Sequence, residues 1–334
     1  MKHVYTSIFT LALLAISSNS FAQGGPNGSG EYYKPADGKK GAALKTALCG
    51  IIYNRTERGS ADDVYKMLWN DFKTTDVRSD GKVWDMYSNI TNFTFGTDQD
   101  SGNHSYEGKA YNREHSFPKS WFGGKVMPMY ADLFHLYPTD GKVNENRGDL
   151  PFGETNGSNK NSANDFSKIG VCTYPGYTGT VFEPNDIYKG DFARTYFYMV
   201  TCYEEKLPDW VNKGNANITI NSSGLVTWQL EMLMKWSKND PVSADKETPR
   251  NNAVYGIQGN RNPFIDYPGL EEYIWGSLTD VAFSYNDYQV PTAIMTIKAE
   301  PANKEGVMYN LAGQKVDKSY KGVVIMNGKK MIQK

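Results

Sequence analysis

The chain has few cysteines, almost no net charge and no long hydrophobic run, and each shortage excludes a class of protein. Its 334 residues contain 3 cysteines, too widely spaced for a zinc knuckle. Lys+Arg number 36 and Asp+Glu 37, a net charge of -1, so no overall positive field attracts polyanions and any such partner must bind a local patch. No segment reaches the roughly 18 consecutive apolar residues that a transmembrane helix needs.

The first residues have the pattern of a secretory signal peptide. Lys2 gives a basic start, an apolar run follows from Ile8 to Ile16, and the small residue Ala22 marks the expected cleavage site. We therefore expect residues 1–22 to be removed and the mature protein to be secreted without a membrane span, to the cell surface, the medium or the periplasm.

The cysteines would then reach an oxidising compartment, where at most one intramolecular pair can form. Cys49 and Cys202 lie in helical patterns, which favours the interpretation that they are small buried residues. A disulfide between Cys172 and Cys202 is the alternative that the sequence leaves open.

Hydrophobic spacing predicts a helix-rich α+β body over residues 23–290. Apolar residues recur at helical spacing in four segments, whereas two short pieces, VWDMY and FTFG, have strand-like composition, and residues 156–165 are rich in Asn, Ser and Gly and predict a loop. The four helical patterns are Leu44 to Ile52, Ala61 to Phe72, the amphipathic Phe192 to Tyr203, and Leu225 to Trp236.

The C-terminal part has a different character from the body. Residues 291–305 contain scattered prolines and no long period, which indicates a linker. Residues 306–334 alternate apolar and polar side chains around glycine turns, which predicts a small β-appendage. This segment resembles the closing part of the C-terminal sorting tails on proteins exported by Bacteroidetes, and the resemblance implies that the secretion machinery is a partner.

Two nearby stretches carry chemically active side chains. The first, YNREHSFPKSWFGG (Tyr111 to Gly124), sets Glu114 directly beside His115. Neighbouring side chains on a strand point to opposite faces, so both can serve one site only if the strand ends or bends there, as Pro118 makes plausible. The second stretch predicts a short helix from Thr139 to Arg147.

Side chains of this predicted helix complete a set that suits phosphodiester hydrolysis. Asp140, Asn144 and Arg147 fall at spacings of four and three and share one face. Hydrolysis needs a base for water, a hard cation on the phosphate and a positive group for developing charge. The oxygens of Glu114 and Asn144 suit Mg²⁺, which leaves His115 as the base.

Three other interpretations stand beside this one. The Glu–His pair could be structural, with Arg113, Lys119 and Lys142 as ordinary solvated charges. The chain could be a catalytically inactive extracellular nucleic-acid-binding module. A glycan-active protein would suit the 23 tyrosines, but the pair of catalytic carboxylates that such enzymes use has no clear signal in the sequence.

The strings NREHSFPKSWF and DLFHLYPTDGKVNENRGDLPFG resemble the signature of the endonuclease I family, and FEPNDIYKGDFARTYFYM and QGNRNPFIDYPG agree with it. The resemblance covers roughly Leu44 to Gly276. It implies a helix-rich α+β fold around a ββα-metal (His-Me) finger. It also implies sequence-tolerant, metal-dependent cleavage of DNA, and often of RNA, leaving 5′-phosphate and 3′-hydroxyl ends. We expect one Mg²⁺ ion per site, for which another divalent cation could substitute.

By motif position, His115 matches the general base of the family, Glu114 the first metal ligand and Asn144 the second. Many relatives carry two histidines where this chain has Phe134 and His135, so we interpret His135 as a supporting or structural residue. The arginine that grips the phosphate in some relatives cannot be placed by motif. The two candidates are Arg147 and Arg194, with ion pairing between the finger and the helical body as the alternative role.

We expect DNA and RNA to bind through backbone phosphates rather than base edges, because no recognition helix or base-stacking module is visible. With balanced total charge, that contact must come from a modest basic cleft. We expect a monomer.

Overall fold

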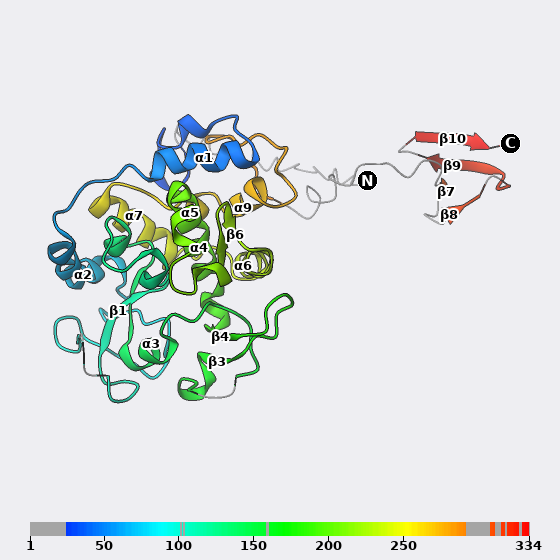
Figure 1. Ribbon diagram of the computed structural model, residues 1–334. Helices are drawn as coiled ribbons and strands as arrows, with labels where there is room; N and C mark the ends of the chain where they lie inside the picture. The colour runs from blue at the N-terminus through cyan, green and yellow to red at the C-terminus, as the bar shows by residue number, and fades with distance from the viewer. Residues whose placement is uncertain are drawn as a thin grey trace, which may run out of the picture.

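The computed structural model describes residues 25–100, 102, 104–157, 160–291, 308–310, 315–317, 319–326 and 329–333. The predicted signal peptide lies outside the described residues, as does all of the predicted linker except Pro291. The described body combines helices with small two-stranded sheets (Figure 1), which confirms the α+β prediction.

The helices of the body are distributed along its whole length. They are α1 (Gly41–Ile52), α2 (Ala61–Thr75), α3 (Gly141–Arg147), α4 (Lys189–Cys202), α5 (Leu207–Trp210), α6 (Thr227–Asn239), α7 (Glu247–Gln258), α8 (Pro263–Asp266) and α9 (Leu270–Ile274). The first two predicted helices are confirmed. Helix α2 begins after Ser60, whose hydroxyl accepts a hydrogen bond from the backbone N–H of Asp63, as an N-cap serine does.

Helix α4 forms the centre of the body. Every residue from Gly190 to Cys202 is buried, and the helix packs against α1, α6 and α8. The prediction that it would be amphipathic is therefore wrong, because neighbours cover its polar side as well as its apolar side. Tyrosine and threonine hydroxyls supply its polar character, and in the interior these can be hydrogen-bonded.

The described residues of the body form three small antiparallel sheets: β1 (Tyr111–His115) with β2 (Leu136–Asp140), β3 (Lys168–Val171) with β4 (Thr180–Glu183), and β5 (Ile220–Asn221) with β6 (Gly224–Leu225). Leu225, expected at the start of a helix, pairs with Ile220 in the last of these sheets, and α6 starts two residues later. The described part of the predicted loop at residues 156–165 contains only the 3-10 turn Ala163–Asp165.

The two strand-like pieces VWDMY and FTFG do not form strands. Val83 makes only an isolated bridge with Val77, and the residues after it are turns and irregular chain. In this segment the carboxylate of Asp85, rather than the backbone of a neighbouring strand, accepts hydrogen bonds from backbone N–H groups, those of Tyr87 and Asp140. The strand-like composition reflects burial of Tyr87 and Phe93 rather than sheet pairing.

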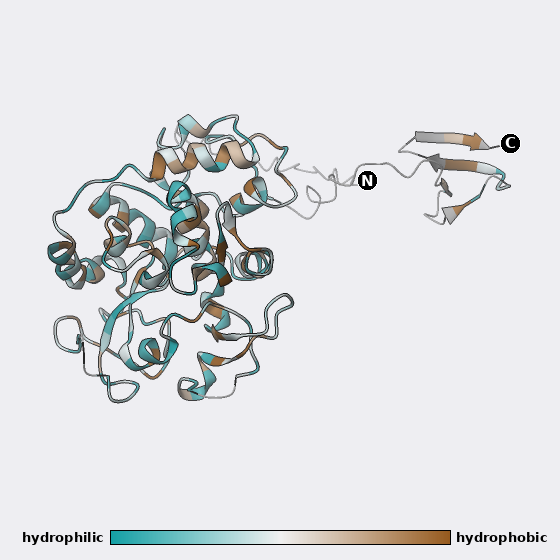
Figure 2. Ribbon diagram, in the orientation of Figure 1, coloured by the Kyte–Doolittle hydropathy of each residue, from teal (hydrophilic) through white to brown (hydrophobic). Residues whose placement is uncertain are grey.

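Strands β1 and β2 and helix α3 form one continuous unit. The strands pair antiparallel from Tyr111 opposite Asp140 to His115 opposite Leu136, and α3 follows β2 directly. The helix starts at Gly141 rather than at Thr139, because Asp140 caps it by accepting from the N–H groups of Lys142 and Val143, both at 2.9 Å. Most of α3 is hydrophilic (Figure 2), so polar contacts must hold it in place.

The C-terminal segment forms a separate antiparallel sheet in the order β10-β9-β7-β8. Its strands are β7 (Met308–Asn310), β8 (Lys315–Val316), β9 (Gly322–Met326) and β10 (Lys329–Gln333). The predicted β-appendage is thus present, whereas its sorting role stays a prediction.

All three cysteines are described, buried and free, so the Cys172–Cys202 disulfide is not formed and their role as small buried residues agrees with the structure. Across the described part of the chain, no helix is both long and apolar enough to cross a bilayer.

Candidate active site

A cleft of about 420 Å³ opens where β1 ends. It brings together the three residues that the sequence predicted to do the chemistry, Glu114, His115 and Asn144. The complete lining is Tyr65, Asn112, Arg113, Glu114, His115, Pro118, Lys119, Ser120, Asn144, Gly148 and Asp149. The strand does end at His115, as the adjacent acid and imidazole required.

The cleft uses both faces of β1. On one face Asn112 and Glu114 contact α3, through Asn144 and Arg147 respectively. On the other face Arg113 donates to the backbone oxygen of Tyr65 on α2, at 2.8 Å. This follows from the two-residue alternation of a strand. Because β1 stops at His115, the cleft wraps around its end and reaches both faces.

His115 is held as a neutral imidazole with a defined tautomer. Its Nε2 lies 3.0 Å from the backbone oxygen of Tyr130, and since a carbonyl only accepts, Nε2 carries the proton and Nδ1 holds the lone pair. The ring stacks on Tyr130 at 5.3 Å between centroids. Burial, and then the neighbouring His135, lower the pKa of His115 well below its ordinary value.

Glu114 is a buried carboxylate, 3% exposed, with a buried cation behind it. Its Oε1 accepts from Arg147 and from the hydroxyl of Tyr87. Arg147 also donates to the backbone oxygen of Ser116 at 2.7 Å, and its guanidinium lies 4.2 Å from the ring centre of Phe152. A carboxylate offers two oxygens with about four acceptor positions, so this contact leaves coordinating capacity.

Arg147 is therefore placed behind the cleft rather than in it. Its side chain has no exposed surface and does not line the cleft. The arrangement fits the ion-pair alternative: the last residue of α3 is tied to β1 through Glu114, which explains how a hydrophilic helix is fixed. Its other candidate role, gripping a phosphate, has no support from this position.

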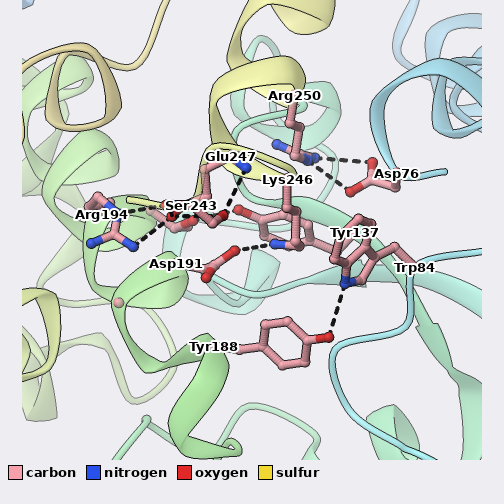
Figure 3. A network of polar contacts seen from close by, with 12 residues as sticks. Asp76, Trp84, Tyr137, Tyr188, Asp191, Arg194, Ser243, Lys246, Glu247 and Arg250 are labelled. Atoms are coloured by element: carbon pink, nitrogen blue, oxygen red, sulfur yellow. Dashed lines mark hydrogen bonds and ion pairs between the residues drawn. The ribbon is translucent and has the colours of Figure 1, made fainter. Parts of the chain in front are cut away.

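Arg194 belongs to a network of polar contacts around α7 (Figure 3). It donates to both carboxylate oxygens of Glu247, at 2.6 and 2.8 Å, within a buried network that includes the Lys246–Asp191 and Arg250–Asp76 pairs. It too is absent from the cleft lining. The structure thus does not bring Arg194 to the predicted site, and its contacts are those of an ion pair inside the helical body.

The loop that holds His115 is itself anchored by a buried acid. Asp132 accepts hydrogen bonds from Arg55, Tyr198 and Tyr203, at 2.7 to 2.8 Å. Burial alone would raise the pKa of Asp132, but the Arg55 cation, then His135 and the hydrogen bonds from Gln258 and Tyr203, bring it far below its ordinary value. The carbonyl of Tyr130 is therefore presented to His115 from a rigid segment.

His135 is fully buried and donates from Nε2 to the backbone oxygen of Met129, at 2.6 Å. Its ring centre is 5.4 Å from that of His115. These contacts support the interpretation of His135 as a structural residue behind the base.

Arg113 and Lys119 are the cations of the cleft lining. Arg113 stacks over the rings of Tyr65 and Trp69, at 3.8 and 4.2 Å, so it is committed to α2. Lys119 is exposed and forms no ion pair with any residue in the described ranges. The expected basic patch is thus modest, and Lys119 is its accessible charge.

A larger cavity of about 1080 Å³ lies beside α1 and the segment that follows it. Its arginines are already paired, Arg55 with Asp132 and Arg58 with Asp71. Its lining has no histidine beside a carboxylate, as the smaller cleft has. We therefore identify the smaller cleft as the candidate active site.

The sequence analysis did not identify three residues that contact the candidate site residues. Asn112 lies two residues before Glu114 and therefore on the same strand face, a signal that was available. Tyr87 reaches Glu114 from a segment read as a strand, and Tyr130 acts through its backbone oxygen. Neither of these last two contacts has a local sequence signal.

Comparison with known proteins finds similar nucleases. The family model described as Endonuclease I matches residues 40–269. The chain is 37% identical to the extracellular ribonuclease of Bacillus amyloliquefaciens over 254 residues, covering 73% of this chain and 78% of that protein. It is 26% identical to an extracellular deoxyribonuclease of Aeromonas hydrophila over 140 residues, covering 41% and 50% respectively. The chain is an endonuclease and belongs to the endonuclease I family.

Proposed function

We propose that this protein is a secreted, metal-dependent endonuclease that hydrolyses the phosphodiester bonds of RNA and DNA with little regard to sequence. The observation that carries the proposal is the convergence of three groups in one cleft: a neutral imidazole with a free lone pair on Nδ1, a carboxylate and a side-chain amide. We assign these to His115, Glu114 and Asn144, and the β1–β2–α3 unit to a ββα-metal finger.

His115 is suited to act as general base because its one ring proton is on Nε2, where it is hydrogen-bonded, and Nδ1 is left to accept a proton. With Nε2–H donated to Tyr130, only Nδ1 can take a proton from water. The stacking of the ring on Tyr130 limits its rotation. Nδ1 would take a proton from water as the water oxygen attacks phosphorus; the bond from phosphorus to the 3′-oxygen breaks, and that oxygen takes a proton from solvent, so the products would carry 5′-phosphate and 3′-hydroxyl ends.

The side chains beside His115 fit a hard divalent cation. Glu114 offers carboxylate oxygen and Asn144 amide oxygen, the ligand types that Mg²⁺ prefers, and this ion keeps several waters and needs few protein ligands. The described residues contain no group of three or more His, Cys, Asp and Glu side chains placed for a metal. When bound, Mg²⁺ would act as a Lewis acid on the scissile phosphate.

The relatives support both nucleic acids as substrates. The matches that cover most of this chain are named extracellular ribonucleases, and the shorter matches include extracellular deoxyribonucleases. Their names, with the N-terminal pattern, also support secretion. We also propose that the mature chain is a monomer and that the C-terminal sheet binds the secretion machinery.

Incubation of the purified protein with plasmid and with RNA, each with Mg²⁺ or with a chelator, tests the proposal. We expect both substrates to be degraded with Mg²⁺ and neither with chelator, and labelling of the product ends should give 5′-phosphates. Binding of both nucleic acids without cleavage of either would instead favour the inactive binding module.

Lys119 should contribute to substrate binding by charge alone. We expect Lys119→Ala to weaken binding of all sequences alike and to lower the slope of log K against log salt by about 1, since one phosphate contact releases about one counterion. Lys238→Ala, which removes an exposed lysine of α6 outside the cleft, is the matched control and should leave the slope unchanged. The measurement is DNA affinity by fluorescence anisotropy across a salt series. Equal slopes for wild type and Lys119→Ala would contradict the assignment.

A further inference from the structure

A chain of polar side chains runs alongside the cleft and ends at Asn144. The amide nitrogen of Asn144 donates to Oδ1 of Asn112 at 2.7 Å. The amide nitrogen of Asn112 lies 3.3 Å from Nε2 of His104. Neither Asn112 nor His104 belongs to the three residues assigned to the chemistry.

The donor-to-acceptor direction of these hydrogen bonds decides which side-chain atom of Asn144 is left to face the cleft. A side-chain amide has one accepting oxygen and one donating NH₂ group. With the NH₂ of Asn144 engaged by Asn112, its oxygen is left over, and within the described residues no donor is bound to that oxygen. Rotating Asn144 by half a turn would set two oxygens 2.7 Å apart, which is repulsive.

His104 fits this direction in one tautomer, the one whose Nε2 accepts; its Nδ1 then carries the proton and has no hydrogen-bond partner among the described residues. When its Nε2 accepts from the NH₂ of Asn112, the oxygen of Asn112 must face Asn144. If Nε2 donated instead, both amides would reverse, and Asn144 would present NH₂, which cannot coordinate a cation. His104 is held close to α3, since a Cβ added to Gly141 would lie 2.1 Å from its Nδ1.

We propose that Asn112 is a positioning residue that turns the amide oxygen of Asn144 toward the metal. The inference rests on the proposed function, because it assumes that Asn144 is a metal ligand. It explains why Asn144, half-exposed on a hydrophilic helix, can hold one rotamer. Partners behind a ligand orient it, and losing one typically costs about 10- to 100-fold in metal affinity.

The test is direct binding of Mn²⁺, followed by the electron paramagnetic resonance signal of the free ion, with no substrate present. We expect Asn112→Ala to weaken Mn²⁺ binding by about 10-fold or more. Asn112→Asp should bind at least as tightly as wild type, because a carboxylate still accepts from the NH₂ of Asn144 and cannot reverse. Asn92→Ala removes an exposed asparagine outside the cleft lining and should match wild type. Circular dichroism checks that each variant is folded.

The outcomes separate this inference from the proposed function. If wild type binds Mn²⁺ and folded Asn112→Ala binds it equally well, the positioning role is overturned and the metal site stands. Loss of binding in Asn112→Asp as large as in Asn112→Ala would overturn it too. If wild type itself binds no Mn²⁺, the metal-dependent function is wrong as well.

Discussion

Replacing His115 with alanine is expected to lower kcat by about 10² to 10⁴, the usual effect of losing a general base. The variant keeps Glu114 and Asn144, so the loss should not be recovered by raising Mg²⁺. The removed ring is packed against Tyr130, so folding must be checked by circular dichroism. Substrate affinity should be measured separately from turnover, with cleavage followed at saturating substrate.

Glu114→Gln is the matched comparison for this loss. We choose Gln because its amide oxygen can still accept a hydrogen bond from the buried Arg147, whereas Ala would remove the acceptor as well as the charge and add a larger folding defect. The neutral amide keeps size and one oxygen but coordinates Mg²⁺ less well, so activity should recover at high Mg²⁺. If added Mg²⁺ rescues His115→Ala and not Glu114→Gln, the assignment of base and ligand is reversed.

The pH profile gives a second, independent reading of the base. An unperturbed imidazole titrates near about 6.5. Because burial, then His135, lower the pKa of His115, neutral His115 persists to lower pH and the acid limb should lie below that value. A cation held by Glu114 acts in the same direction. The limb should be absent from the residual activity of His115→Ala.

The convergence of the candidate site residues could be predicted from the sequence because they are concentrated in two short stretches. Glu114 and His115 are neighbours, and Asn144 follows within the same β1–β2–α3 unit, so local rules of strand and helix suffice to bring them together. The helices α1 and α2 were predictable for a similar reason, since each has a local hydrophobic period.

The partners of these residues could not be predicted, because they depend on contacts between distant segments. Tyr87 reaches Glu114 from a stretch whose strand-like composition was misleading. Arg194 was a candidate for phosphate binding because a charged residue in a helix is usually solvated. In the structure it is paired with Glu247, which lies 53 positions away in the sequence. The burial of α4 on all sides likewise depends on which helices surround it, and no period within the helix carries that information.

Arg147→Met is expected to be the most destabilising of the substitutions considered, by about 3 to 5 kcal/mol in the free energy of unfolding, as when one partner of a buried ion pair is removed. Methionine fills much of the space beside Phe152 but leaves the carboxylate of Glu114 buried without its cation. It also removes a donor from the backbone oxygen of Ser116, at the point where β1 ends. Urea unfolding followed by fluorescence measures the loss.

Two controls decide whether that loss comes from the unpaired charge. Arg78→Met removes an arginine whose pair with Asp80 is exposed, and a solvated pair contributes little, so its effect should be far smaller. The double variant Glu114→Gln with Arg147→Met removes both charges and should be more stable than Arg147→Met alone, because no buried carboxylate is left unpaired. If the double variant is instead destabilised by the sum of the two single losses, Arg147 stabilises the fold by packing and hydrogen bonding to Ser116, and the ion pair is not what ties α3 to β1.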